Sequence, residues 1–173
     1  LDKTPGTLIV PEGDYGGSLT NGANHFGKIA LADTDTWTFE ANRNDYVLVS
    51  IGEIFESEED PGFYPLIDLR GPDGARVQYN HGALSAFLGE IAPLTGTYTV
   101  TVYDSTGLGN GDATGSNVLR LVKTPGTLIL PEGDDGGSLT NGANHFGKIG
   151  LADTDTWTFT AAPPVSDTTP PTA

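Results

Sequence analysis

The sequence predicts an all-β sandwich followed by part of a second repeat. Two observations carry this prediction. Short apolar or alternating segments recur every 8–20 residues between turns rich in Gly, Pro and Asp. Residues 121–161 repeat residues 1–41 with five differences, at an offset of 120 residues, which is the size of one domain. The chain has no Cys and no Met among its 173 residues, so neither disulfides nor thiolate metal sites are available to it.

The first expected strand of the domain is Thr36–Glu40, whose alternation places Trp37 and Phe39 on one face. The same pattern places Trp157 and Phe159 together in the second copy, and we expect all four rings to be core residues. The next strand, Tyr46–Ile51, is rich in β-branched residues.

A hairpin is expected next. It pairs Leu66–Leu69 with Val77–Tyr79 across the turn Gly-Pro-Asp-Gly at 71–74. Thr97–Tyr103 alternates, with Tyr98, Val100 and Val102 on one face, and Val118–Val122 leads into the second copy. The segment 84–91 has apolar residues at helical spacing, but Gly82, Gly89 and Pro93 surround it, so we predict a strand there.

The domain organisation follows from the repeat. Residues 1–120 are expected to form one complete sandwich, 121–161 a partial second repeat, and 162–173 a Pro/Thr-rich linker. The sequence begins at Leu1, which we interpret as a fragment or a processed chain. The partial repeat is too short to bury its own apolar strands. It therefore begins a further domain, docks beside the first sandwich, or completes a neighbouring molecule by strand exchange.

The charge and the polar residues exclude several functions. The formal net charge is −15, so phosphate backbones repel the chain, and no apolar run is long enough to span a membrane. Ser85, His81 and Asp73 are present but lie in no nucleophile motif, and we predict no catalysis. His25 and His145, in identical contexts, are expected in turns or at the surface rather than on a metal.

Acidic residues give the strongest candidate site. Asp33 and Asp35 are two residues apart before a strand, and Glu12 and Asp14 form an upstream acidic loop. Together they supply oxygen ligands of the kind that calcium prefers. The equivalents in the second copy are Glu132, Asp134, Asp153 and Asp155. The alternative is that these residues cap turns by accepting hydrogen bonds from their own backbone.

A second acidic run precedes two aromatic residues, Phe63 and Tyr64. Its members are Glu53, Glu56, Glu58, Glu59 and Asp60. We interpret this run as a solvated loop, while a cation site or an aromatic binding tip remains open.

Three segments resemble, in order, the bacterial pre-peptidase C-terminal domain family: Leu-Ala-Asp-Thr-Asp-Thr-Trp-Thr-Phe (31–39), Pro-Leu-Ile-Asp-Leu-Arg-Gly-Pro-Asp-Gly (65–74) and Leu-Thr-Gly-Thr-Tyr-Thr-Val-Thr-Val (94–102). The resemblance covers roughly residues 26–122. It implies a jelly-roll-like antiparallel β-sandwich in a secreted or cell-surface protein, without catalytic activity. It also implies calcium near Asp33 and Asp35, and collagen or sugar binding in some members.

Two functions remain open after this reading. The first is a repeat module of a bacterial surface adhesin or self-assembling fibre, stabilised by calcium and joined through the duplicated segment. The second is a glycan- or collagen-binding accessory module of a secreted enzyme. The second function requires exposed aromatic residues, for which the candidates are Tyr46, Phe63, Tyr64, Tyr79 and Tyr103.

Overall fold

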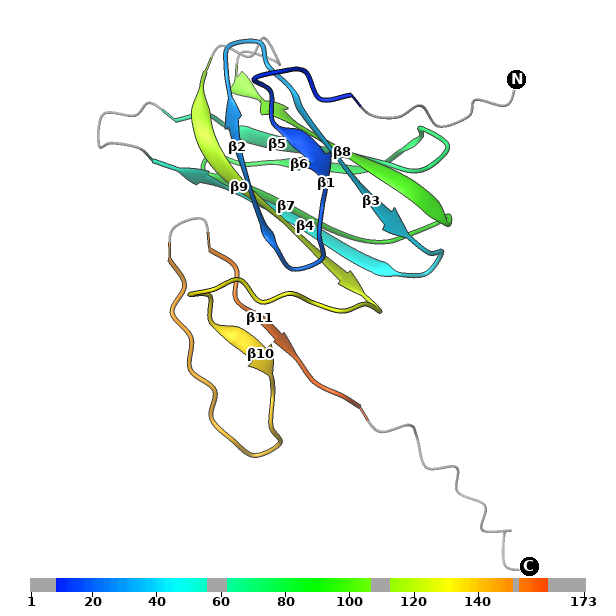
Figure 1. The fold of residues 1–173 in the computed structure, drawn as a ribbon, viewed down its shortest axis with the longest axis vertical. Helices are drawn as coiled ribbons and strands as arrows, with labels where there is room; N and C mark the ends of the chain where they lie inside the picture. The colour runs from blue at the N-terminus through cyan, green and yellow to red at the C-terminus, as the bar shows by residue number, and fades with distance from the viewer. Residues whose placement is uncertain (1–8, 56–61, 107–112, 151–152, 162–173) are drawn as a thin grey trace, which may run out of the picture.

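The computed structural model describes residues 9–55, 62–106, 113–150 and 153–161. They form two facing sheets, and a smaller two-stranded unit lies outside them (Figure 1). The first sheet contains, in spatial order, β1 (Gly16–Ser18), β3 (Asp35–Ala41), β8 (Gly96–Asp104), β5 (Pro65–Arg70) and β6 (Arg76–His81). The second sheet contains β2 (Asn24–Ile29), β9 (Gly115–Thr124), β4 (Tyr46–Ile54) and β7 (Ser85–Ile91). The predicted all-β sandwich is confirmed.

Alternation in the sequence determines which side chains enter the core. Tyr98, Val100 and Val102 of β8 are at most 1% exposed, while the threonines between them face outward. Trp37 and Phe39 of β3 are also buried, and Phe39 stacks on Tyr98 with ring centroids 5.4 Å apart. The core is therefore a layer of apolar side chains between the two sheets.

The expected strands are present in the described residues, with small extensions at their ends. The ambiguous segment 84–91 is a strand, β7, which pairs antiparallel with β4. Two short strands of the first copy were not predicted from the sequence, β1 and β2. In β1, Gly16 has a φ of 155°, and a Cβ there would clash with the carbonyl oxygen of Thr36. Glycine therefore lets β1 lie parallel to β3, in an otherwise antiparallel sandwich.

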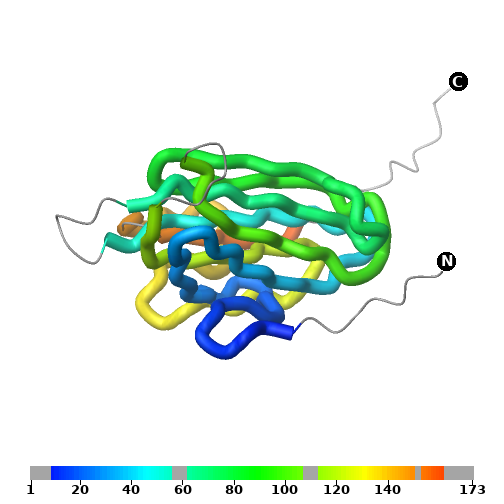
Figure 2. The backbone as a smooth tube through the Cα atoms, turned by 90° about the horizontal axis from the view of Figure 1, so that it is seen from above, coloured from blue at the N-terminus to red at the C-terminus, as the bar shows by residue number. Residues whose placement is uncertain are grey.

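The second copy forms the smaller unit. Its strands β10 (Gly136–Ser138) and β11 (Thr156–Thr158) pair parallel in the register of β1 and β3. The unit lies on the side of β2, β9 and β4, outside the sandwich (Figures 1 and 2). β9 itself crosses the boundary between the copies, because Leu121–Thr124 pair with Tyr46–Val49. Residues 162–173, the expected linker, lie outside the described residues.

Candidate functional site

The acidic residues of the first copy lie where the chain enters β3. Asp33 forms the turn before the strand: its carboxylate accepts hydrogen bonds from the backbone N–H groups of Ala30 at 3.2 Å and Thr34 at 2.7 Å. The turn-capping alternative therefore describes Asp33 in this structure. Glu12 and Asp14 are exposed in the upstream loop.

Asp35 differs from the other carboxylates because it is fully buried. Its oxygens accept no well-formed hydrogen bond within the described residues, although the backbone N–H of Tyr15 is close enough to lower its pKa in part. Burial, followed by the negative charge of Asp33 and then of Asp14, raises the pKa of Asp35 to about 7. Gly27 on the neighbouring β2 makes room for it, since a Cβ at Gly27 would lie 2.8 Å from Asp35 Oδ2. Asp35 is thus a partly protonated carboxyl at neutral pH that would gain from a cation.

The second copy repeats this arrangement with less cover. Asp153 accepts a hydrogen bond from the N–H of Gly150 at 3.1 Å, as Asp33 does from Ala30. A Cβ at Gly147 would clash with Asp155 Oδ2, as at Gly27. Burial, followed by the charge of Asp153, raises the pKa of Asp155, and Glu132 is exposed.

Arg120 of β9 connects the sandwich to this second acidic cluster. Its side chain leaves the outer face of the second sheet and is only 3% exposed. Nη1 donates to Asp134 Oδ2 at 2.8 Å and to the carbonyl oxygen of Thr154, both in the second copy. Its Nε and Nη2 have no hydrogen-bond partner in the described part of the chain. A buried arginine thus holds the two units together through one ion pair and one backbone contact.

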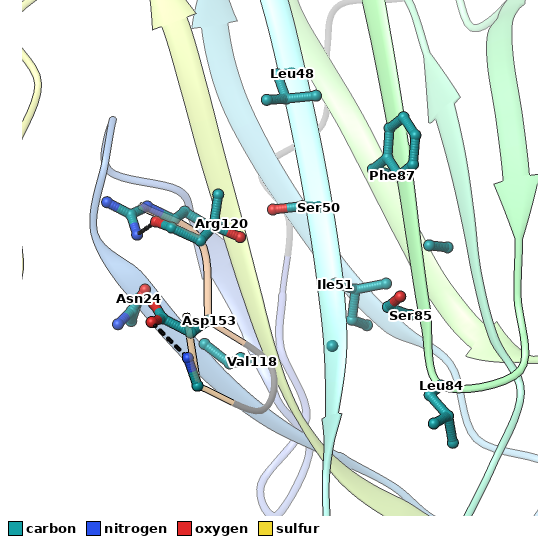
Figure 3. A pocket seen from close by; sticks show the side chains of 14 residues that line it. Asn24, Leu48, Ser50, Ile51, Leu84, Ser85, Phe87, Val118, Arg120 and Asp153 are labelled. Atoms are coloured by element: carbon teal, nitrogen blue, oxygen red, sulfur yellow. Dashed lines mark hydrogen bonds between the residues drawn. The ribbon is translucent and has the colours of Figure 1, made fainter. Parts of the chain in front are cut away.

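A cavity of about 600 Å³ lies beside this contact, between the outer face of the second sheet and the second copy. Figure 3 shows Arg120 and Asp153 on one side and Phe87 and Leu84 on the other, across Leu48 of β4. Phe87 is 65% exposed and Leu84 is 50% exposed. The docked unit therefore covers only part of an apolar sheet face.

Arg120 is not among the site residues predicted from the sequence. It is one of two charged residues in its strand, with Lys123, and it lies one position before the repeat begins. Only its place within β9, whose alternate side chains Leu119 and Leu121 enter the core, marks it as facing outward. Its partner Asp134 is predicted from the sequence as a calcium ligand, whereas the structure shows it in an ion pair.

The predicted calcium ligands do not converge on one point in this structure. Among the described residues, no three His, Asp or Glu side chains converge in an arrangement that could hold one. The side chains of Asp14, Asp33 and Asp35 nevertheless offer oxygens, which are the ligands of calcium, and the Asp35 carboxylate is buried without an ion-pair partner among the described residues. The donor chemistry fits calcium, and the side chains of Asp14 and Asp33 would have to turn toward Asp35 to complete a site.

Some sequence expectations about aromatic and acidic residues were wrong. Phe63 is not an exposed tip but is 1% exposed in the core. Glu53 is not in a solvated loop: it is 1% exposed, and Oε1 accepts a hydrogen bond from the N–H of Phe63 at 2.7 Å. The rest of that acidic run, 56–60, lies outside the described residues. Phe159 is 74% exposed, because within the described residues no strand pairs with β11 on the side where β8 pairs with β3.

The remaining aromatic candidates are distributed over both sheets. Tyr46, Tyr64 and Tyr79 are each 42–52% exposed. Tyr79 and Tyr103 share the outer face of the first sheet, on either side of β5. Between them, Asp68 is paired with Arg76 at 2.7 Å and with Arg70 at 3.1 Å, and the Arg76 guanidinium lies 5.1 Å from the centre of the Tyr79 ring. His25 accepts a hydrogen bond from the N–H of Thr20 and packs edge-on against Trp37.

The geometry defines an all-β sandwich to which part of a second repeat is docked. One solved structure with a similar fold is the pre-peptidase C-terminal domain of a collagenase from Bacillus anthracis. It is 13% identical over 62% of this chain and 95% of that chain, with a TM-score of 0.48. This is the family that the three sequence motifs resemble.

Two periplasmic inhibitors of g-type lysozyme are similar to a comparable degree. The inhibitor from Aeromonas hydrophila is 17% identical over 64% of this chain and 98% of its own, with a TM-score of 0.47. The inhibitor from Salmonella Typhimurium is 19% identical over 63% and 98%, with a TM-score of 0.45. No protein-family model matches the sequence, and no curated protein is recognisably similar to it. At these identities and TM-scores, the similarities say nothing of ligand or activity.

Proposed function

We propose that this chain is a non-catalytic extracellular repeat module of a bacterial surface adhesin or fibre, in which consecutive repeats are held at a fixed angle. The observation that carries the proposal is the buried contact of Arg120 with the second copy. Arg120 precedes the second repeat by one residue, so a chain that continued with the same 120-residue period would place an arginine at each junction. Its function is then mechanical: rigid sandwiches joined by rigid connections. Among the described residues, no helix is long and apolar enough to cross a membrane.

The junction is tested by replacing Arg120→Gln. Asp134 would lose its partner, so we expect the second copy to detach from the sheet while the sandwich stays folded. Small-angle scattering should show a larger radius of gyration, and the half-buried Trp157 should become more accessible to acrylamide. Arg43→Gln is the matched control, because it makes the same change in charge at an exposed turn. Equal scattering curves for Arg120→Gln and the wild type would contradict a rigid junction.

Calcium belongs to this proposal as a stabiliser of the first acidic cluster. Asp35, with Asp33, Asp14 and Glu12, would hold the ion, which would supply a positive charge to a buried carboxylate. In the second copy, Asp155, Asp153, Asp134 and Glu132 are the equivalents, and Arg120 already contributes a positive charge there. Calcium at about a hundred times its dissociation constant would raise the free energy of unfolding by about 2.7 kcal/mol.

Melting curves in calcium and in chelator test this part. We expect calcium to raise the Tm of the wild type and to leave Asp35→Asn unchanged. Asp73→Asn is the control, since Asp73 lies in the turn after β5, where its carboxylate accepts a hydrogen bond from the N–H of Ala75. Identical wild-type curves in calcium and chelator would remove calcium from the proposal and leave the junction untouched.

Self-association enters the proposal through unpaired strand edges. Within the described residues, β11 pairs only with β10, whereas β3 pairs with both β1 and β8. An open edge of this kind can pair with another chain. Light scattering over a range of concentrations measures this directly: a mass that stays at 18.0 kDa would exclude association through the edge.

Glycan or collagen binding is a second candidate function, favoured by Tyr79 and Tyr103 on one outer face. Aromatic rings beside a fixed charged pair can stack on a sugar ring while the charges donate or accept hydrogen bonds. We expect retention of the wild type on glycan or collagen beads and loss of retention for Tyr79→Ala. Tyr46→Ala, on the other sheet, is the control. Absence of wild-type retention would argue against this function.

A further inference from the structure

The second copy already has the local shape of the first. The N–H of Leu139 donates to the carbonyl of Thr158 at 2.7 Å, as Leu19 does to Thr38. The imidazole of His145 lies 5.2 Å from the ring of Trp157, against 5.3 Å for His25 and Trp37. The described parts of the second copy are therefore prepared to take the place of the first.

The two copies differ in how far their apolar side chains are buried. Phe39 is 5% exposed and Ile29 is fully buried, whereas Phe159 is 74% and Ile149 is 63% exposed. In the first copy, β8 covers β3 and β9 pairs with β2. The chain contains one such pair of covering strands in its described residues, and two near-identical segments that fit against them.

We propose that the two copies compete, within one chain, for a single position in the sandwich. In the alternative state, β11 would pair with β8 and residues 144–149 would pair with β9, in the register that β3 and β2 now have. The first copy would then lie outside the sandwich. This inference goes beyond the proposed function and does not require calcium or a fixed junction.

The chain is long enough for this exchange. Asn21 lies beside the end of β9, because its Nδ2 donates to the carbonyl of Lys123 at 2.9 Å and the N–H of Gly22 donates to Leu121. Gly16, at the start of β1, is five residues from Asn21, so it lies at most about 17 Å from Asn21. The thirteen residues from Lys123 to Gly136 can span about 40 Å. β10 can therefore reach the position of β1.

The exchange requires the first copy to separate from β4 at a turn where a change of connection is tolerated. The first copy would separate from the rest of the sandwich at the turn between β3 and β4, where Asn42, Arg43 and Asn44 are exposed. In the alternative state the sandwich strands follow one another in the order of a circular permutant, since the second copy comes after β9 in the chain. Exposed turns are the sites where such a permutation is tolerated.

The same contacts explain why the first copy is the major occupant. The exchange breaks the Arg120–Asp134 ion pair and the hydrogen bond from the N–H of Ile129 to Asn21. It also replaces Glu40, which accepts a hydrogen bond from Thr97, by Thr160. Exchange of copies between two molecules would lose the same contacts and would also cost the free energy of association. It would still leave one copy of each chain outside a sandwich. Exchange within the chain is favoured because the second copy is held at a high effective concentration.

A mutant cycle tests the competition. Phe39→Ala disables the first copy, Phe159→Ala disables the second, and the double variant disables both. A buried Phe→Ala change alone lowers the folding constant about a hundred- to a few thousand-fold. We expect the double variant to lose this full amount, Phe39→Ala to lose much less, and Phe159→Ala to lose little. Val100, in β8, lies outside the duplicated segment, so no second copy can replace it. Val100→Ala should therefore lower the folding constant by the same factor with or without Phe159→Ala. Equal losses in Phe39→Ala and the double variant would overturn the proposal.

The two tryptophans, one in each copy, give a second readout. In Trp37→Phe the remaining Trp157 reports the second copy, and adding Phe39→Ala should shift its emission to the blue and protect it from acrylamide. The blue shift should be present at concentrations low enough for the mass to be 18.0 kDa. An unchanged emission would overturn the proposal. A blue shift that appears only together with a doubled mass would also overturn it, and would instead support exchange between molecules.

Discussion

The first and second copies have nearly the same residues but only one of them is inside a sandwich. Their local hydrogen bonds agree: a glycine-permitted parallel pair, a histidine against a tryptophan and an aspartate in the turn before the last strand. Their burial differs, because Ile29 is fully buried and Ile149 is 63% exposed. The difference separates what a segment specifies by itself from what its neighbours supply. Turns and pairing are local properties, while core residues are made by the strands that cover them.

The largest expected effect is a difference in the free energy of unfolding between Ile29→Ala and Ile149→Ala, which are equivalent positions in the two copies. Both changes are made in a chain that carries Phe159→Ala, so that the second copy is a poor substitute for the first. Ile29→Ala should lower the free energy of unfolding by about 2–5 kcal/mol, because it leaves a cavity between the sheets. Ile149→Ala should change it by less than about 0.5 kcal/mol. Urea denaturation measures both, and equal costs would mean that the second copy is covered in solution.

The next effect depends on pH. The pKa of Asp35 is raised to about 7 in the folded protein, above its ordinary value of 3.8. The folded state therefore holds this proton more tightly than the unfolded chain, so its contribution to stability is complete below about pH 4 and is lost as the pH rises to about 7. We expect the wild type to lose about 1–3 kcal/mol over this interval relative to Asp35→Asn, which does not titrate.

The comparison with the second copy provides the control. Asp155 also has a raised pKa, but Arg120 opposes the rise, and among the described residues β11 has no neighbouring strand equivalent to β8. Asp155→Asn should change the pH dependence of stability less than Asp35→Asn does. Denaturation midpoints between pH 4 and 8 measure this, and a pH profile unaffected by Asp35→Asn would show that its carboxyl is solvated or already paired with a cation.

Much of the sandwich could be predicted because its strands alternate. The faces of β8, the hairpin between β5 and β6 and the burial of Trp37 all follow from the period of two. The short strands β1 and β2 could not be predicted, since Gly16 and its neighbours have no apolar alternation, and pairing with β3 and β9 defines them.

The candidate site was predicted only in part, for a related reason. The acidic residues could be named from the sequence, but the burial that distinguishes Asp35 from Asp33 comes from packing against β2. Arg120 was missed because its partners, Asp134 and Thr154, come from a unit whose docking the sequence left open. Phe63 was misplaced because it follows an acidic run, although Glu53 turns inward to accept a hydrogen bond from its backbone.

The smallest expected effect concerns one of the five positions at which the copies differ. Thr97 Oγ1 donates to Glu40 Oε1 at 2.5 Å across β3 and β8, and Thr160 cannot accept at the same reach. Glu40→Thr should therefore cost the first copy less than about 1 kcal/mol, since the bond is exposed. The reverse change, Thr160→Glu, should cost nothing while the second copy lies outside. Together the two changes move the preference toward the second copy, so Trp157 in a Trp37→Phe chain should become slightly more protected from acrylamide. If the protection falls instead, contacts other than Glu40 decide which copy the sandwich takes.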